Sequence, residues 1–304
     1  MLNEQECQTI LMNPQTAQGD DWLLERKDYI GASEIGTLLG VNRWETPASL
    51  WMKKKGLLAP KALTESMVHG LNHEAYVQWC FEALVGLKTE RSHTYRTGPG
   101  LILGATPDFE VYDPNDPGFF GLLEVKTAGT GTMAEFSEAS GGLPERYAAQ
   151  CQFQMGVAGA TVCYLWALVC GQRLERYTVQ RDEEVIANLF ALATGWWETY
   201  MVGDETPPMT ASTVDKELLD QMYPVDNNLK VYATPDQTEL IAGLWHNQKH
   251  RKEYEAEEKR IVNQLKAEMG ECSILESQLG TATWKADKNG QRSFRMKWEG
   301  ESNG

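Results

Sequence analysis

The segment from Gly104 to Lys126 constrains the fold more than any other part of the chain. It reads GATPDFEVYDPNDPGFFGLLEVK, with two apolar runs on either side of a turn rich in proline, asparagine, aspartate and glycine. Such turn residues between apolar runs predict a β-hairpin. Because side chains alternate faces along a strand, Glu124 and Lys126 share one face, and Val125 points the other way, into a core.

A carboxylate at each end of this hairpin predicts a metal site. Asp108 follows a proline just before the first strand. If strand pairing brings it level with Glu124, two carboxylates and the Lys126 ammonium meet, which suits magnesium with a lysine beside it. A Pro-Asp followed roughly 10 to 30 residues later by an acid-x-Lys arises by chance in roughly one 300-residue chain in ten. On this pattern alone, a surface hairpin with solvated charges is the simpler interpretation.

Composition limits the class of protein. With 304 residues, 42% of them hydrophobic, the chain can bury a substantial core. A net charge of −15 argues against a surface that binds nucleic acid all over, although a local basic channel is compatible with it. The six cysteines show no CxxC or zinc-type spacing and indicate reduced residues of a cytosolic protein. The longest apolar run, Val162–Cys170, is too short to cross a bilayer, and the N-terminus lacks a signal sequence, so we expect a soluble intracellular protein.

A change in composition marks a domain boundary. Residues 203–213 contain two prolines, small polar residues and no apolar pattern. We therefore expect a domain over 1–205 and an appendage over 206–304. The appendage contains a helix that starts at the capping box Thr234–Gln237, followed by a hairpin around Asn289-Gly290. The basic residues of that hairpin could touch phosphates, although a solvated hairpin is the simpler interpretation.

Polar residues in the N-terminal part of the chain suggest an anion site. Ser33 is placed to cap a short helix over 34–39, and a helix N-terminus attracts anions. Arg26 lies a short turn upstream. On its own, Ser33 is better explained as a simple helix cap.

Two further helices carry polar side chains among apolar ones. Glu74 lies in a long apolar helix predicted over 65–86, where a charged residue faces either solvent or a site. Three glutamines occur in the helix that starts at Pro144, and amides need partners if they are buried. Gln150 and Gln154 are one turn apart, and Gln152 lies on another face.

The order of these features resembles the YqaJ-type viral recombinase family, or phage lambda exonuclease family, of the PD-(D/E)xK nuclease superfamily. The resemblance covers roughly residues 20 to 205. The fold it implies is α/β, with a restriction-endonuclease-like core whose central mixed β-sheet is flanked by helices, and a C-terminal helical and β-hairpin appendage. The matching segments are Arg26 and Ser33 in RKDYIGAS, Glu74 in HGLNHE, Thr106-Pro107-Asp108, Glu124-Val125-Lys126, and Gln152 in YAAQCQFQM. Thr106 stands where the family often has serine.

The resemblance also implies roles for these residues. Asp108, Glu124, the Val125 carbonyl and Glu74 would bind magnesium, with two ions per site and Mn²⁺ as a substitute. Lys126 would orient or deprotonate the attacking water, and Gln152 would orient Lys126 or the nucleophile. The pocket for a terminal 5′ phosphate would be formed by Arg26, Ser33 and Thr106.

The activity implied is Mg²⁺-dependent 5′→3′ digestion of double-stranded DNA ends, leaving 3′ overhangs for a single-strand annealing protein. The resemblance further implies a homo-oligomeric ring, with a trimer favoured, in the cytoplasm of a bacterial host and of phage or prophage origin. Alternatives are a restriction-like endonuclease and a non-catalytic DNA-binding adaptor with a nuclease fold. An iron–sulfur nuclease of the superfamily is disfavoured because its cluster cysteines are missing.

Overall fold

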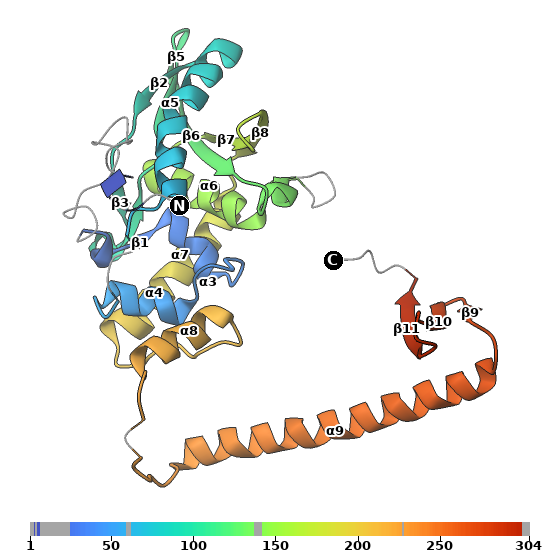
Figure 1. Ribbon diagram of the computed structural model, residues 1–304. Helices are drawn as coiled ribbons and strands as arrows, with labels where there is room; N and C mark the ends of the chain where they lie inside the picture. Colours follow the sequence, from blue (N-terminus) through green and yellow to red (C-terminus); the bar gives the residue numbers. More distant parts are fainter. Residues whose placement is uncertain are drawn as a thin grey trace. The chain divides into compact units, whose positions relative to one another are not determined.

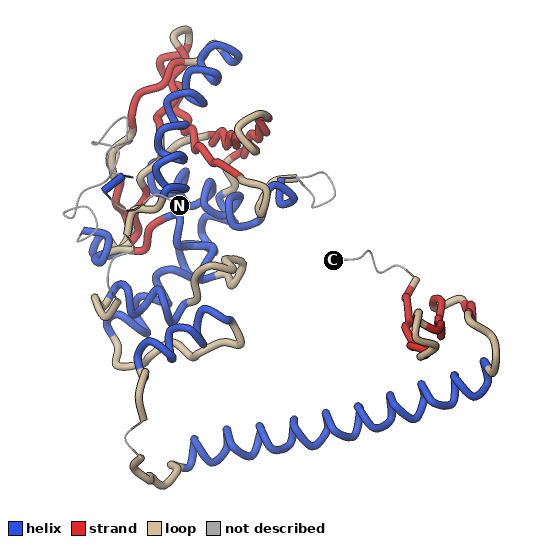
Figure 2. Tube along the Cα trace, viewed as in Figure 1, coloured by secondary structure: helices blue, strands red, loops and turns tan. Residues whose placement is uncertain are grey.

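The protein is described by a computed structural model that covers residues 3, 5–6, 25–58, 62–136, 142–226 and 228–299. It divides into two compact units, Met1–Val225 and Asp226–Gly304, and each is described by itself. Figure 1 labels their elements, and Figure 2 shows helices and strands by colour. Cys7, one of the six cysteines, lies outside the described residues.

A five-stranded mixed sheet forms the centre of the first unit. In spatial order its strands are β2 (Lys88–Arg91), β5 (Phe109–Asp113), β6 (Asp116–Ala128), β7 (Val162–Val169) and β8 (Arg173–Gln180). Only the β6–β7 pair in this sheet is parallel. The α/β fold with a central mixed sheet flanked by helices, expected from the sequence, is confirmed.

Side chains of β6 alternate between the two faces of this sheet, and a different helix packs on each face. Leu123 and Val125 pack in one buried cluster with α5 (Glu65–Val85). Leu122, on the opposite face, packs in another cluster with α6 (Glu145–Ala158). Val125 therefore points into the core, as the alternation predicts, and Glu124 and Lys126 share the other face with Leu122.

The hairpin predicted around residues 113–118 is present. β5 and β6 are antiparallel, with Phe109 opposite Leu123 and Asp113 opposite Asp116. The Asp113 carboxylate accepts a 2.8 Å hydrogen bond from the Asn115 amide and so stabilises the turn. Because Phe109 is paired with Leu123, the preceding residue, Asp108, comes level with Glu124.

A second, three-stranded sheet holds the N-terminal segment beside this hairpin. β1 (Ile30–Gly31) is parallel to β4 (Leu103–Ala105), and β3 (Tyr95–Thr97) pairs with β4 on its other edge. The ring of Tyr29 lies directly over Gly104, where an added Cβ would come within 2.2 Å of it. Only glycine permits this approach, which places the segment after β1 next to the residues that follow β4.

Four more helices complete the first unit, and three of them share a buried core with α6 and the three-stranded sheet. They are α3 (Ile35–Leu38), α4 (Pro47–Lys54), α7 (Glu183–Trp197) and α8 (Thr213–Met222). Short 3-10 turns occur at η1 (Arg26–Asp28), η2 (Ala32–Glu34), η3 (Pro99–Leu101) and η4 (Met133–Phe136), and η6 (Glu198–Val202) is a π-helical turn. The shared core contains Ile30, Leu50, Leu103, Phe153 and Leu189, all buried.

The capping role predicted for Ser33 is wrong. Residues 32–34 form the turn η2, and the residue that precedes α3 is Glu34, whose side chain makes no capping hydrogen bond. The Ser33 hydroxyl instead accepts a 2.9 Å hydrogen bond from the Arg26 guanidinium. The side chain is thus directed by an arginine seven residues earlier in the chain rather than by its own helix.

The two units divide between Val225 and Asp226, beyond the boundary that composition favours at 205. The reason is α8, which packs on α4. Asp215 of α8 is 1% exposed and accepts hydrogen bonds from the Thr46 hydroxyl and from both the amide and the hydroxyl of Thr210. Residues up to the end of α8 therefore belong structurally with the first unit.

The second unit consists of one long helix and a three-stranded antiparallel sheet. Its elements are α9 (Pro235–Met269), β9 (Ile274–Ser277), β10 (Gly280–Ala286) and β11 (Arg292–Trp298). The predicted capping box is present, with reciprocal hydrogen bonds between Thr234 and Gln237. In the part of the chain that the structure describes, no helix is both long and apolar enough to cross a membrane.

Candidate active site

Asp108, Glu124 and Lys126 lie together at the end of the β5–β6 hairpin. The Asp108 carboxylate accepts a 2.7 Å hydrogen bond from the Val125 amide, which fixes it against β6. The Lys126 ammonium donates to Glu124 at 2.5 Å, so these two side chains form an ion pair on one face of the strand. Glu124 is only 4% exposed, and a buried charged pair of this kind needs further partners to be stable.

Glu74 of α5 borders the same cluster through Arg91 of β2. The Arg91 guanidinium donates to the Glu74 carboxylate at 2.7 Å and to the Asp108 carbonyl at 3.4 Å. Burial raises the pKa of Glu74 above its ordinary value, Arg91 opposes this shift, and the nearby Glu124 carboxylate adds to it. Glu74 is therefore close enough to the hairpin carboxylates to interact with their charge.

The carboxylates of this cluster repel one another. Burial raises the pKa of Asp108 well above its ordinary value, and the negative charges of Glu124 and Glu74 raise it further. For Lys126, burial disfavours the charged form, but Glu124 and Asp108 outweigh that effect and raise its pKa. Three carboxylates facing one lysine and one arginine leave an excess of negative charge that a bound cation would offset.

The donor set fits magnesium in its chemistry. Asp108 and Glu124 supply hard carboxylate oxygens, and Mg²⁺ in proteins is commonly held by one or two carboxylates together with water and substrate phosphates. Among the described residues, no group of three or more His, Cys, Asp or Glu side chains is arranged to hold a metal ion. Glu124 forms an ion pair with Lys126, and Glu74 forms one with Arg91. The two carboxylates of the hairpin, Asp108 and Glu124, therefore fit an open site in which water and substrate supply the other ligands.

Gln152 does not belong to this cluster, which corrects the prediction made for it. Its amide nitrogen donates to the Gln180 carbonyl at 2.7 Å, and its amide oxygen accepts from the Asp182 amide at 3.0 Å. Gln150 and Gln154, one turn apart on α6, contact the site instead. They donate to the two oxygens of Glu124 at 2.6 and 2.7 Å.

Arg26, Ser33 and Thr106 line one small open pocket with a volume of about 50 Å³. The Arg26 guanidinium donates to the Ser33 hydroxyl at 2.9 Å. The Thr106 hydroxyl lies 2.9 Å from that of Thr94. Gln150 and Gln154 complete the lining, so the same two amides contact both the pocket and Glu124. The three residues expected to hold a phosphate are thus adjacent to the carboxylate cluster.

Gln150, Gln154 and Glu34 also contribute to this region, although the sequence did not assign them to it. Spacing along α6 shows that Gln150 and Gln154 share a face, and burial among apolar neighbours requires that they have partners. Both amides are buried, at 6% and 1% exposed. Their shared face and apolar neighbours were therefore the sequence signal that could have assigned them to the site. Glu34, 2% exposed, forms an ion pair with Arg26 at 3.2 Å, and no sequence pattern indicated that pair.

Comparisons with known proteins agree with this architecture. The chain is 28% identical over 256 residues to the uncharacterized protein YqaJ of Bacillus subtilis (strain 168), a match that spans 82% of this chain and 78% of that protein. The crystal structure of an alkaline exonuclease from Laribacter hongkongensis has a TM-score of 0.50 at 18% identity, over 60% of this chain and 93% of that one. The structure of that exonuclease in complex with dAMP also gives 0.50, at 17% identity, over 68% and 99% of the two chains.

These structural likenesses concern the fold alone. Residues 21–161 match the YqaJ-like viral recombinase domain. That range contains Arg26, Glu74 and the whole β5–β6 hairpin. The chain therefore carries a YqaJ-like viral recombinase domain, matched over residues 21–161, and is similar to YqaJ over 82% of its length.

Proposed function

We propose that this protein is a magnesium-dependent deoxyribonuclease that digests linear double-stranded DNA from its 5′ ends and leaves 3′ overhangs. One observation carries the proposal. Gln150 joins the Asp108–Glu124–Lys126 cluster to the pocket beside Arg26, so a cleavage centre and an anion pocket share a wall. A nuclease that must grip a terminal phosphate next to the bond it cuts needs this adjacency.

The comparisons support a nuclease role. The domain match is to a viral recombinase family, and the solved structures with the same fold are described as an alkaline exonuclease, one of them with dAMP bound. Cleavage polarity, metal dependence and the use of the overhangs in recombination are our proposals.

The carboxylates are the proposed metal ligands. Asp108 and Glu124, with the Val125 carbonyl, would hold Mg²⁺, and Glu74 would contribute directly or through water. We expect two ions per site and substitution by Mn²⁺. Bound metal supplies an activated water and offsets negative charge on the scissile phosphodiester.

The remaining groups of the cluster orient the reaction. Lys126 donates to Glu124 at 2.5 Å, and an ammonium held by a carboxylate acts more readily as an electrostatic and positioning group than as a base. Gln150 and Gln154 fix both oxygens of Glu124 and so hold the carboxylate in one orientation. This assignment replaces the role that the sequence suggested for Gln152.

The anion pocket would set the direction of digestion. A guanidinium and two hydroxyl groups, from Arg26, Ser33 and Thr106, form a donor set suited to a terminal phosphate. If this pocket holds the 5′ phosphate, the bond presented to the carboxylates is the first one from that end. Each cleavage exposes a new 5′ phosphate, and the enzyme proceeds stepwise.

The proposal extends to assembly and partners. We propose a homo-oligomeric ring, with a trimer favoured, that threads the product strand. The 3′ overhangs would pass to a single-strand annealing protein in phage-type recombination inside a bacterial host cell.

Digestion of labelled DNA tests the proposal. Linear duplex labelled at its 5′ ends should release labelled mononucleotide when Mg²⁺ is present and should remain intact in EDTA. Covalently closed circular duplex should remain uncut. Nicking of the circle would instead indicate a restriction-like endonuclease, and binding of linear duplex without any Mg²⁺-dependent loss would indicate a DNA-binding adaptor.

A further inference from the structure

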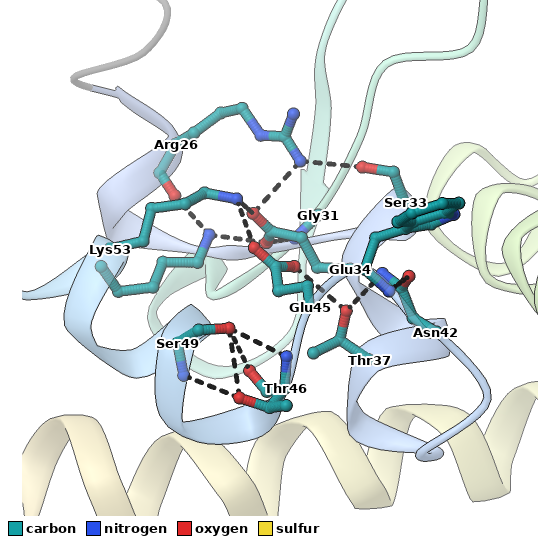
Figure 3. Close-up of polar contacts among 12 residues, drawn as sticks. Arg26, Gly31, Ser33, Glu34, Thr37, Asn42, Glu45, Thr46, Ser49 and Lys53 are labelled. Atoms are coloured by element: carbon teal, nitrogen blue, oxygen red, sulfur yellow. Dashed lines mark hydrogen bonds and ion pairs between the residues drawn. The ribbon is translucent and has the colours of Figure 1, made fainter. Parts of the chain in front are cut away.

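A buried carboxylate lies directly beneath the anion pocket. Glu34 is 2% exposed, and Figure 3 shows cations converging on it. Its Oε1 lies 3.2 Å from the Arg26 guanidinium and 3.7 Å from the Lys53 ammonium, and its Oε2 accepts a 2.8 Å hydrogen bond from the Gly31 amide. Glu34 therefore holds both the side chain of Arg26 and the backbone that leads from β1 into η2.

Lys54 is the principal partner of Glu34 and is almost as deeply buried, at 4% exposed. Its ammonium contacts Glu34 Oε2 at 2.6 Å and donates to the carbonyls of Arg26 and Tyr29, each at 2.5 Å. Arg26 is the first residue of η1, and Tyr29 is the residue that follows its end. The lysine thus fixes the backbone from which the Arg26 side chain extends.

The three cations around Glu34 would repel one another without it. Burial favours the neutral form of Glu34, but the charges of Lys54, Arg26 and Lys53 outweigh burial and lower its pKa to about 2, so it is a carboxylate at neutral pH. A second carboxylate, Glu45, shares only Lys53, at 2.9 Å. One excess positive charge remains in this group of five.

We propose that Glu34 and Lys54 are positioning residues for the 5′-phosphate pocket. They hold the Arg26 guanidinium toward Ser33 and so set the preference for phosphorylated ends without touching DNA. The inference rests on the proposed function and assigns residues to its end selectivity.

The test compares digestion of duplexes that carry a 5′ phosphate or a 5′ hydroxyl, with Glu34→Gln and Lys54→Met. The ratio of the two kcat/KM values should fall at least about tenfold in both variants, mainly through a higher KM for phosphorylated ends. The rate on hydroxyl ends should stay within about twofold of wild type. Asp215→Asn is the matched control, because it alters another buried carboxylate away from the pocket and should leave the ratio unchanged.

A double variant separates positioning from folding. Leaving one buried charge unpaired is strongly destabilising, whereas removing both partners is often tolerated. Glu34→Gln combined with Lys54→Met should therefore recover thermal stability relative to either single variant and still show the low ratio. A folded double variant with the wild-type ratio would overturn the inference. If the wild-type protein itself cut both ends equally, the end pocket of the proposed function would fail and this inference with it.

A separate observation concerns the sheet of the second unit. Residues 280–298 contain five basic residues and one acidic residue, in a chain whose net charge is −15. Paired residues of an antiparallel sheet share a face, and the register places Lys297 opposite Thr281, Arg295 opposite Thr283, and Lys285 opposite Ser293. One face therefore carries three cations and three hydroxyl groups. Glu276, opposite Thr281 on β9, is an acidic residue of that face.

The other face of this sheet is directed toward α9. Ala282 is buried, the Arg292 guanidinium stacks on Trp284, and Lys266 of α9 lies over the Phe294 ring. The basic face is left exposed: Lys285, Arg295 and Lys297 are all accessible. Within the described part of the chain, no ion pair joins any of these three to a carboxylate.

We infer that this basic face, defined by Lys285, Arg295 and Lys297, binds the phosphate backbone of DNA. The partner is chosen by charge complementarity, since hydroxyl groups between exposed cations are the usual donors to phosphate oxygens. Contacts of this kind carry no sequence information. They would hold the substrate duplex independently of cleavage, and the inference rests on DNA as the substrate of the proposed function.

Salt dependence of DNA binding by the full chain tests this inference, measured by fluorescence anisotropy in EDTA. Lys285, Arg295 and Lys297 are replaced together by alanine. The steepness with which the logarithm of the DNA association constant falls against the logarithm of salt concentration should decrease by up to about 2.7, because each lost phosphate contact removes about 0.9. The matched control replaces three exposed lysines of α9, Lys249, Lys252 and Lys259, with alanine. An equal loss in both triple variants, or no loss in the first, would overturn the inference, whereas failure of cleavage alone would concern only the proposed function.

Discussion

Gln150 donates a 2.6 Å hydrogen bond to Oε1 of Glu124, the same oxygen that accepts from Lys126. The amide is 6% exposed and also lines the pocket beside Arg26. Like Gln154, this side chain connects the carboxylate expected to bind metal with the site expected to bind phosphate. Any change that moves this amide should disturb both.

Replacing Gln150 by alanine should lower kcat about 10- to 100-fold, the usual cost of removing a group that orients a metal ligand. Gln152→Ala should leave kcat within about twofold of wild type but lower the melting temperature, because it breaks the hydrogen bonds to Gln180 and Asp182. Steady-state digestion of linear duplex and thermal unfolding measure the two effects. The reverse pattern would restore the role that the sequence suggested for Gln152.

The sequence predicted the hairpin well because its determinants are local. Turn residues fix the chain reversal, and the alternation of side chains along a strand fixes which of them share a face. Counting residues back from the turn on both strands then places Asp108 opposite Glu124. The helix containing Gln150, Gln152 and Gln154 was also predicted, but which of its faces meets the sheet depends on packing against β6. That information lies in tertiary contacts, and a motif match selected the wrong glutamine.

Other features could not be predicted because they depend on which side chains the fold brings together. Ser33 has the chemistry of a helix cap, yet the Arg26 guanidinium takes its hydroxyl group. α8 joins the first unit through a buried hydrogen bond between Asp215 and Thr46, 169 residues apart. Composition predicts a boundary in the proline-rich stretch before α8, because composition does not indicate the hydrogen bond between Asp215 and Thr46.

Asp108→Asn and Lys126→Ala should each reduce cleavage by at least about 10³-fold while the protein remains folded. Asparagine keeps an oxygen that can accept from the Val125 amide, so the hairpin should be preserved and only the charge lost. Circular dichroism and thermal melts check the fold, and digestion of end-labelled duplex checks activity. Calorimetric titration with Mg²⁺ should show weaker binding for Asp108→Asn. Digestion at the wild-type rate by either variant would refute the site assignment.

Arg26→Gln should reduce the preference for 5′-phosphorylated ends about tenfold or more, because a guanidinium–phosphate interaction is replaced by a neutral amide. Ser33→Ala should give a smaller reduction in the same direction, since one hydroxyl donor is lost. Competing a phosphorylated and a hydroxyl-ended duplex in one reaction measures the preference directly. Thr37→Ser, a conservative change outside the pocket lining, serves as the control and should not alter it.

Glu34 should make the stability of the protein sensitive to acid. Its pKa is lowered to about 2 in the folded protein, against 4.5 for the free group, so its contribution is complete above about pH 5 and is lost as pH falls toward 2. A shift of this size corresponds to about 3 kcal/mol of unfolding free energy. Urea unfolding between pH 7 and pH 3 should therefore show a steeper loss for the wild type than for Glu34→Gln, and parallel curves for the two proteins would contradict the assignment of that carboxylate to the Lys54 and Arg26 ion pairs.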